Sequence, residues 1–169
     1  MRTQAFVGLG SNLDHPRRHV ARALAALARL PRSQLVAASR NYISAPVGCI
    51  EPQPDYVNAV AAVRTRLSPS ALLRHLHDIE RRHGRTRDAH AERNAARTLD
   101  LDLLAFGRRR THHEHLTLPH PRMHERAFVL KPLLDIAPST VIAGRGAARM
   151  LMRKVSGQRV ARTRSHALR

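Results

Sequence analysis

Arg97-Thr98-Leu99-Asp100-Leu101-Asp102-Leu103-Leu104 is the stretch that says most about the fold of this chain. Its leucines alternate with its two aspartates at a period of two, which predicts a β-strand with one buried face. Both carboxylates then leave the same face of the sheet, with backbone positions roughly 6–7 Å apart. Two hard oxygen ligands just after an arginine can hold Mg²⁺ against a polyphosphate. A lone Asp-x-Asp pair is equally compatible with the exposed polar face of an edge strand, so other parts of the chain must decide.

Length and composition predict one folded domain. The chain has 169 residues, of which 43% are hydrophobic, enough to form a real core. We expect a single domain over residues 1–156 and a frayed basic tail over 157–169. There is no apolar run of about 18 residues and no signal-peptide pattern, and Cys49 is the single cysteine. These features favour a cytoplasmic protein without an intramolecular disulfide.

The charge of the chain is strongly positive. Thirty basic residues against twelve acidic ones give a formal net charge of +18, and all but two of the basic residues are arginines. Such a charge attracts polyanions such as nucleotides, nucleic acids or anionic membrane surfaces. Charge alone does not choose among these three.

Helical and strand-like patterns alternate along the chain without strict β-α-β regularity, which predicts an α+β sandwich rather than a doubly wound sheet. Ser68 and Pro69 read as the N-cap and first-turn proline of a helix whose apolar stripe runs through Leu72, Leu76 and Ile79. Strands are expected over 4–9, 35–42, 56–65, 97–104 and 116–118, and helices through 20–30, 68–83, 125–136 and 147–155. Residues 44–54 are expected to form a loop, and 107–110 the turn of a hairpin.

Motifs for binding nucleotide phosphates through glycine-rich loops are missing from the sequence. Neither the P-loop pattern nor the protein-kinase glycine loop with its lysine is present. Arginines would have to replace them, and Arg85, Arg87, Arg93 and Arg97 cluster just before the aspartate pair. Guanidinium groups bind phosphate oxygens through paired, charge-assisted hydrogen bonds. In so basic a chain, the same cluster is also compatible with solvated charge.

Taken together, the motifs resemble one known family. The likeness spans roughly residues 4–138, and its parts follow in order along the chain. The blocks are Gly10-Ser11-Asn12-Leu13, Tyr42-x-x-x-Pro46-x-Gly48, Gln53-Pro54-Asp55-Tyr56-Val57-Asn58, Glu80-x-x-x-Gly84-Arg85-x-Arg87, Arg97-Thr98-Leu99-Asp100-Leu101-Asp102, Leu118-Pro119-His120 and Arg126-x-Phe128. This combination resembles the 6-hydroxymethyl-7,8-dihydropterin pyrophosphokinase family and is far more specific than any single block.

The resemblance implies a fold and an activity. The fold would be a ferredoxin-like α+β sandwich, with an antiparallel-rich sheet and helices packed on it. The activity would be transfer of pyrophosphate from ATP to the hydroxymethyl oxygen of the pterin, giving the pterin diphosphate and AMP in folate biosynthesis. ATP would be the co-substrate and two Mg²⁺ ions the cofactors. We expect a monomer that binds these small molecules and no membrane.

The resemblance also implies roles for residues around ATP. Asp100 and Asp102 would hold the two Mg²⁺ ions and, with Arg85 and Arg97, form the catalytic group. The residues implied to bind the nucleotide and its phosphates are Leu73, Glu80, Arg85, Arg87, Arg97, Leu103, Thr117, His120 and Arg126. Read singly, Glu80 is equally compatible with a helix-surface carboxylate, and His120 with a residue that shapes a turn.

A second implied group would bind the pterin. Tyr56 and Phe128 would stack on the two faces of the ring, although either could be an ordinary core aromatic. Asn58 would recognise the amide edge of the pterin through side-chain hydrogen bonds, and backbone groups of Ser44 and Val47 would add more.

Two other functions stay open. One is a paralogue that acts on a related pterin. The other is a basic nucleic-acid-binding module. The small number of aromatic residues, five in the chain, disfavours it, because such modules stack bases on aromatic side chains. Weak nonspecific binding to nucleic acid is expected in either case because of the charge.

The loop before the aspartate pair departs from the family pattern. Members usually carry a tryptophan and a Gly-Pro ahead of the arginine, whereas this chain has no tryptophan and reads Arg93-Asn94-Ala95-Ala96-Arg97. We therefore predict weaker or differently gated ATP binding than in the family at large, with the chemistry retained. Titration of the protein with ATP and Mg²⁺ measures this affinity, and a value typical of the family would contradict the prediction.

Overall fold

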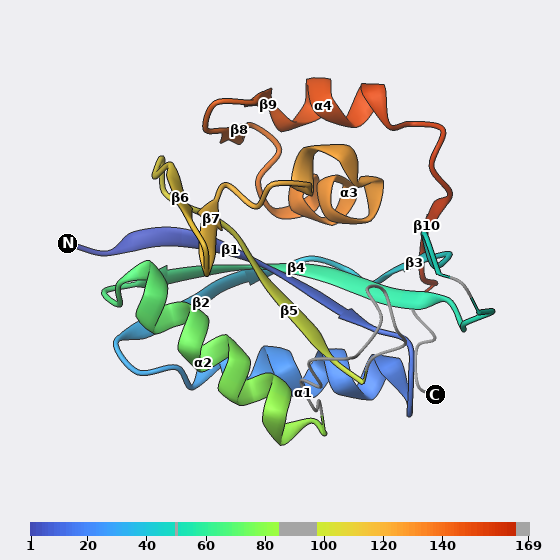
Figure 1. The fold of residues 1–169 in the computed structure, drawn as a ribbon, viewed down its shortest axis with the longest axis horizontal. Coiled ribbons are helices and arrows are strands. Elements are labelled where there is room, and N and C mark those ends of the chain that lie inside the picture. The colour runs from blue at the N-terminus through green and yellow to red at the C-terminus, as the bar shows by residue number, and fades with distance from the viewer. Residues whose placement is uncertain (50, 85–97, 165–169) are drawn as a thin grey trace.

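The computed structural model describes residues 1–49, 51–84 and 98–164, and Figure 1 shows its arrangement of helices and strands. The strands are β1 (Thr3–Ser11), β2 (Ser33–Ala38), β3 (Tyr42–Ser44), β4 (Tyr56–Thr65), β5 (Asp100–Phe106), β6 (Thr111–His113), β7 (Leu116–Leu118), β8 (Val141–Ile142), β9 (Gly146–Ala147) and β10 (Val160–Arg162). The helices are α1 (Pro16–Ala28), α2 (Pro69–Arg82), the 3₁₀ turn η1 (Met123–Glu125), α3 (Ala127–Ile136) and α4 (Ala148–Lys154).

One antiparallel sheet organises the fold. Its strand order is β10-β3-β4-β1-β5, and β2 also pairs with β4. The chain follows the β-α-β-β-α-β pattern of ferredoxin-like folds. The elements in order are β1, α1, β2 together with β3 as one strand position, β4, α2 and β5. The predicted α+β class with an antiparallel sheet is therefore confirmed.

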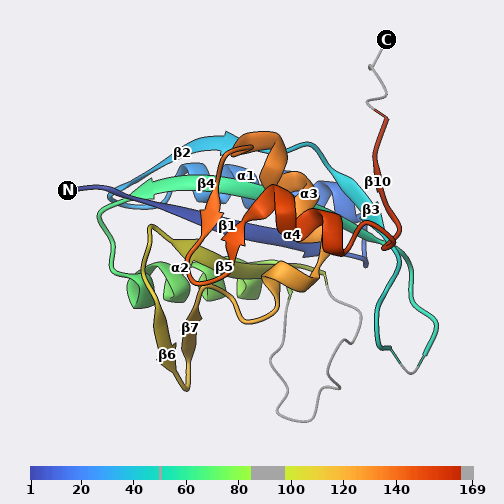
Figure 2. The same cartoon turned by 90° about the horizontal axis from the view of Figure 1, so that it is seen from above.

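Helices cover both faces of this sheet (Figures 1 and 2). Alternation along β4 explains this: Val57, Ala59, Ala61 and Val63 belong to the core under α1 and α2, while Val60 belongs to the core under α3 and α4. Because successive side chains of a strand point to opposite faces, a strand that is apolar at nearly every position requires cover on both sides.

The predicted helix α2 is confirmed in detail. The Ser68 hydroxyl accepts a hydrogen bond from the backbone N–H of Ala71, and Pro69 occupies the first turn. Leu72, Leu76 and Ile79 are buried along one face. The apolar stripe read from the sequence is thus the face that packs on the sheet.

The strand predicted over 35–42 is wrong as a single element, because it divides into β2 and β3. Between them, Ser39 donates its backbone N–H to the Val60 carbonyl and accepts the Val60 N–H on its hydroxyl. The side chain thus replaces a backbone group in the ladder and interrupts the regular pairing. Both pieces still pair with β4, β2 at one end and β3 at the other.

Two other local expectations also differ from the structure. The hairpin turn expected at 107–110 lies instead between β6 and β7, which pair from Thr111 opposite Leu118 to His113 opposite Leu116. The tail expected from residue 157 contributes β10, which pairs with β3, and the N–H of Thr163 donates to the carbonyl of Asn41. An exposed segment of three residues carries no periodicity that a sequence pattern can detect.

In the part of the chain that is described, none of the helices has the length and apolar character needed to span a membrane.

A histidine pair joins α1 to the end of α2. The Nδ1 atoms of His19 and His83 lie 2.9 Å apart, with the two rings edge to face. Burial, the neighbouring His19 and Arg22 all lower the pKa of His83 below its usual 6.5. The contact therefore requires that at least one ring stays neutral.

We predict that acid weakens the fold through this pair. Because the pKa of His83 is lower in the folded chain, the unfolded chain binds the proton more tightly, and stability falls as the pH drops below about 6.5. Urea unfolding at pH 7.5 and pH 5.5 measures the loss, which should be smaller in His83→Gln. Equal pH dependence in the variant and the wild type would contradict this prediction.

Candidate active site

A cavity of about 740 Å³ lies on the sheet face that also carries α3. Its floor comes from β1, β4 and β5, one wall from the loop after β3, and the opposite wall from the segment that enters α3. The lining residues are Gly8, Leu9, Gly10, Ser44–Gly48, Tyr56, Asn58, Ala59, Val60, Asp100, Asp102, Leu104, His120, Arg122, Glu125, Arg126, Phe128, Val129 and Gln158.

The two aspartates project into this cavity from one face of β5. Both are half-buried, whereas Leu101 between them is buried in the core on the other face, as the alternation predicts. In the register with β1, Asp100 lies opposite Gly10 and Asp102 opposite Gly8. The carboxylates therefore stand beside two residues without side chains.

The glycines keep the floor of the cavity open. A Cβ atom at Gly10 would come within 3.5 Å of the Asn58 Oδ1 and 3.8 Å of Tyr56. That contact is ordinary for a methyl group, but any longer side chain would fill the space beside Asp100. Small residues at both positions thus leave room for a ligand between the carboxylates and the wall.

Glu80 supports β5 from the opposite face. Only 1% of the residue is exposed, and its Oε1 accepts a hydrogen bond of 2.8 Å from the backbone N–H of Leu101. The interpretation of Glu80 as a helix-surface carboxylate is therefore wrong. Because the bond fixes the residue between Asp100 and Asp102, Glu80 holds both carboxylates in place through the backbone.

His120 faces the carboxylates as a neutral ring. Its Nε2 lies 4.0 Å from the Asp102 Oδ2, and its Nδ1 accepts the backbone N–H of Arg122 at 3.2 Å. Burial, followed by the nearby Arg126 guanidinium, lowers the pKa of His120 to about 4. With Nδ1 used as an acceptor, the neutral ring carries its proton on Nε2, on the side of Asp102.

Arg126 supplies positive charge to the same side of the cavity. Burial lowers the pKa of its guanidinium while Asp102 opposes that effect, but an arginine stays protonated at neutral pH. Its Cζ lies 5.5 Å from the centre of the Phe128 ring. The cation thus lies over an aromatic face and is attracted by the negative charge of the β5 carboxylates.

The residues predicted to bind a pterin lie together in this cavity. Asn58 is buried, and its Nδ2 donates to the Ser44 hydroxyl at 2.8 Å, which fixes the orientation of the amide. Tyr56 and Phe128 are half-buried and line the same space. Val47 is 67% exposed on the loop wall.

Four residues predicted to bind the nucleotide do not line this cavity. Leu73 and Leu103 belong to the core on the α1 and α2 side of the sheet, where Glu80 also lies, and Thr117 is in β7. β5 is the edge strand of the sheet, and these residues lie on the other side of that edge from the aspartates. The predictions for Arg85, Arg87 and Arg97, and for the altered loop, fall outside the described residues.

Sequence reasoning did not single out several lining residues. Gly8 is recognisable as a site residue only because it lies opposite Asp102 in the β1–β5 register. That register is known only once the sheet is seen. Arg122 and Glu125 carry ordinary surface charges in the sequence, and Gln158 lies in the predicted tail. No pattern in the chain distinguishes these residues from others of their type.

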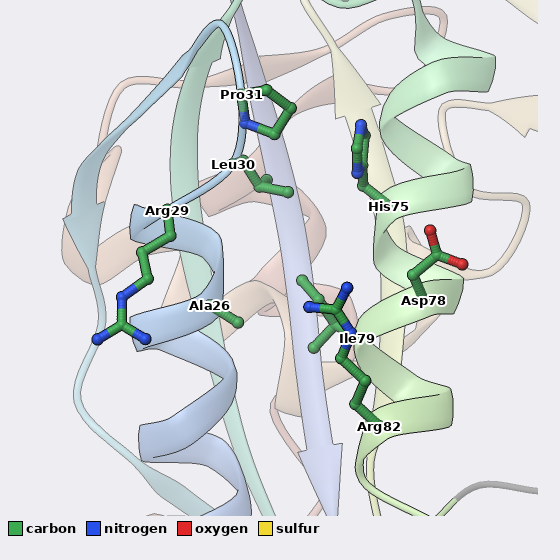
Figure 3. A pocket seen from close by; sticks show the side chains of 8 residues that line it. All are labelled: Ala26, Arg29, Leu30, Pro31, His75, Asp78, Ile79 and Arg82. Carbon is green, nitrogen blue, oxygen red and sulfur yellow. The ribbon is translucent and has the colours of Figure 1, made fainter.

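A second cavity, of about 310 Å³, lies between α1 and α2 (Figure 3). Its charged groups do not converge, because the Arg29 guanidinium lies over α1 while that of Arg82 reaches up beside Ile79. It therefore lacks the paired polar groups that the larger cavity has.

A metal would bind at the larger cavity only with help from other ligands. Among residues 1–49, 51–84 and 98–164, no three His, Cys, Asp or Glu side chains are grouped to hold a metal ion. The Asp100 and Asp102 pair supplies hard carboxylate oxygens, which Mg²⁺ commonly combines with waters and substrate phosphates. The donor set thus suits an ion that arrives with a polyphosphate.

The chain is similar to proteins of one family. Residues 6–138 match the family model described as 7,8-dihydro-6-hydroxymethylpterin-pyrophosphokinase (HPPK). Two relatives named 2-amino-4-hydroxy-6-hydroxymethyldihydropteridine pyrophosphokinase are similar over most of their length. The Haemophilus influenzae protein is 46% identical over 82% of this chain and 84% of its own. The Pseudomonas aeruginosa protein is 49% identical over 80% and 81%.

Solved structures share the fold. A crystal structure of wild-type HPPK-DHPS from Plasmodium falciparum aligns with a TM-score of 0.70, covering 91% of this chain and 43% of that one. An HPPK-DHPS structure in complex with substrates aligns with the same score over 90% and 43%. At 13% identity in both cases, the likeness concerns the fold alone.

We predict that the buried carboxylate of Glu80 is needed for the position of β5. Glu80→Ala leaves the Leu101 N–H without its acceptor and opens a cavity, so the free energy of unfolding should fall by about 2–3 kcal/mol. Glu80→Gln keeps an acceptor oxygen and should lose less. Urea unfolding measures both, and an alanine variant as stable as the wild type would contradict the prediction.

Proposed function

Since the chain belongs to the 7,8-dihydro-6-hydroxymethylpterin-pyrophosphokinase family, we propose that it transfers pyrophosphate from ATP to 6-hydroxymethyl-7,8-dihydropterin. The products are the pterin diphosphate and AMP, a step of folate biosynthesis. The observation that supports this most directly is the single cavity that holds both the aspartate pair and the Tyr56, Asn58 and Phe128 group.

The reaction moves one group between two oxygens. The hydroxymethyl oxygen of the pterin bonds to the β-phosphorus of ATP, the bond from that phosphorus to the AMP oxygen breaks, and the hydroxyl proton is released. Catalysis of this kind depends on positioning and on stabilising negative charge rather than on a covalent enzyme intermediate. The side chains on both sides of the cavity can meet these two needs.

We propose that Asp100 and Asp102 hold Mg²⁺, as two ions, when ATP is bound. Their half-buried carboxylates share one face of β5, beside Gly8 and Gly10, which leave space for phosphates. Bound Mg²⁺ would neutralise phosphate charge and lower the barrier to transfer. In the absence of cations the two carboxylates would repel a polyphosphate, so the pair suits metal-bound ATP.

His120 and Arg126 complete the proposed phosphate site on the opposite wall. The neutral His120 ring donates from Nε2 without adding another positive charge, and Arg126 supplies a fixed cation. A low dielectric around half-buried groups strengthens both interactions. Arg85, Arg87 and Arg97 are proposed to add charge from the loop before β5.

The pterin is proposed to lie between Tyr56 and Phe128, with its amide edge toward Asn58. The bond from Asn58 to Ser44 orients the amide before the ligand arrives, which reduces the entropic cost of binding. A ring that lacks the matching donors and acceptors would leave this buried amide unpaired. We propose that the enzyme acts as a monomer in the cytoplasm, where ATP is available.

The central test is an assay of AMP release from ATP, Mg²⁺ and the hydroxymethyl dihydropterin. We expect Asp100→Asn and Asp102→Asn each to lower kcat/KM by at least about 100-fold, because charge stabilisation at the phosphates is lost. Asp78→Asn is the matched control, since Asp78 pairs with Arg81 of the same helix and does not line the larger cavity. Its activity should stay within about twofold of the wild type.

The assay also separates the alternatives. Unchanged activity in both aspartate variants would contradict the catalytic role of the pair. Turnover of a related pterin in preference to the hydroxymethyl dihydropterin would favour a paralogue with another substrate.

A further inference from the structure

The chain beyond the family-matched region returns to the cavity. Residues 6–138 match the family model, and the following segment runs through β8, β9 and α4. It then passes α3 and reaches β10, which pairs with β3 (Figure 1). Gln158, which lies between α4 and β10, is the point at which this segment lines the cavity.

Gln158 caps the N-terminus of α3 from 31 residues away. Its Oε1 accepts the backbone N–H of Ala127 at 2.9 Å, and its Nε2 donates to the Glu125 carbonyl at 2.7 Å. Arg126, the N-cap residue, provides no side-chain hydrogen bond to the helix. The amide of the first helical residue needs an external acceptor, and Gln158 is that acceptor.

The two residues on either side of Ala127 are the ones that face the cavity. Arg126 and Phe128 both line it, and the guanidinium of Arg126 lies over the Phe128 ring. Because Ala127 is buried and fixed by Gln158, the backbone direction at this point sets where both side chains go.

The same segment is also attached to the opposite wall. Val160 of β10 pairs with Ser44 of β3, and its carbonyl accepts the Lys131 ammonium at 2.9 Å. Ser44 in turn accepts the hydrogen bond from Asn58. Residues 158–162 thus link the α3 wall, with Phe128, to Ser44 of β3, which is hydrogen-bonded to Asn58 of β4.

We propose that Gln158 is a positioning residue for the pterin, fixing the distance between Phe128 and the Ser44 and Asn58 pair. The inference rests on the proposed function and assigns a role to a segment outside the family-matched region. The direct anchors of residues 158–162 are on α3, the turn before it and β3, whereas Asp100 and Asp102 are held by β1 and by Glu80. Loss of Gln158 would shift Arg126 as well as Phe128, but Asp100, Asp102 and His120 of the proposed phosphate site would keep their own anchors. Pterin binding should therefore weaken more than ATP binding.

Steady-state kinetics of Gln158→Ala tests this selectivity. We expect the KM for the pterin to rise about 10-fold, as for the loss of one to two hydrogen bonds, while the KM for ATP, to which Arg126 contributes one group among several, rises no more than about threefold. Gln158→Glu keeps the acceptor for Ala127 but loses the donor to Glu125, so its effect should be intermediate. Gln34→Ala removes an exposed glutamine of β2, outside the cavity lining, and should leave both KM values unchanged.

Hydrogen exchange gives a readout that does not depend on activity. The Ala127 amide should exchange about 10-fold faster in Gln158→Ala than in the wild type, because its acceptor is gone. Faster exchange with an unchanged pterin KM would overturn the proposal and leave Gln158 a purely structural cap. Equal increases in both KM values, or unchanged exchange, would also overturn it. An inactive wild-type chain would instead refute the proposed function.

Discussion

The hydrogen bond from the Leu101 N–H to the buried Glu80 carboxylate is the contact on which the site depends. It joins α2 to the edge strand β5 at the residue between the two aspartates. An edge strand has one free row of backbone groups, and without a partner such a strand can shift or fray. Glu80 accepts one backbone N–H of that row, from the core side. The carboxylates on the opposite face of β5 therefore keep one position relative to β1 and the cavity.

Charge explains the rest of the arrangement. The chain has a formal net charge of +18, so positive charge alone would not direct a polyphosphate to this cavity. What the cavity adds is a defined position for each charged group. Two carboxylates beside glycines leave room for the proposed metal-bound phosphates. Arg126 supplies one cation over an aromatic ring, and His120 remains neutral because burial lowers its pKa. Each of these properties comes from where the side chain lies and not from its type alone.

Local patterns predicted much of the fold and part of the site. The alternation at Asp100 and Asp102 gave their shared face, and the cap at Ser68 with the stripe from Leu72 gave α2. The pieces that patterns missed depend on partners distant in the chain: Ser39 divides a strand by bonding to Val60, and Gln158 caps a helix that begins 31 residues earlier. Periodicity detects which face of an element is apolar, and it carries no information about such pairings.

The sequence by itself therefore determined the α+β class, the family and only part of the group that lines the cavity, because these follow from short periodic or ordered motifs. Only the tertiary structure decided that Glu80 is buried rather than exposed, that Leu73 and Leu103 lie across β5 from the aspartates, and that the C-terminal segment closes the α3 wall. The physical reason is that each of these depends on a hydrogen bond or a strand register between distant residues, whose free energy exists only once the sheet has brought them together.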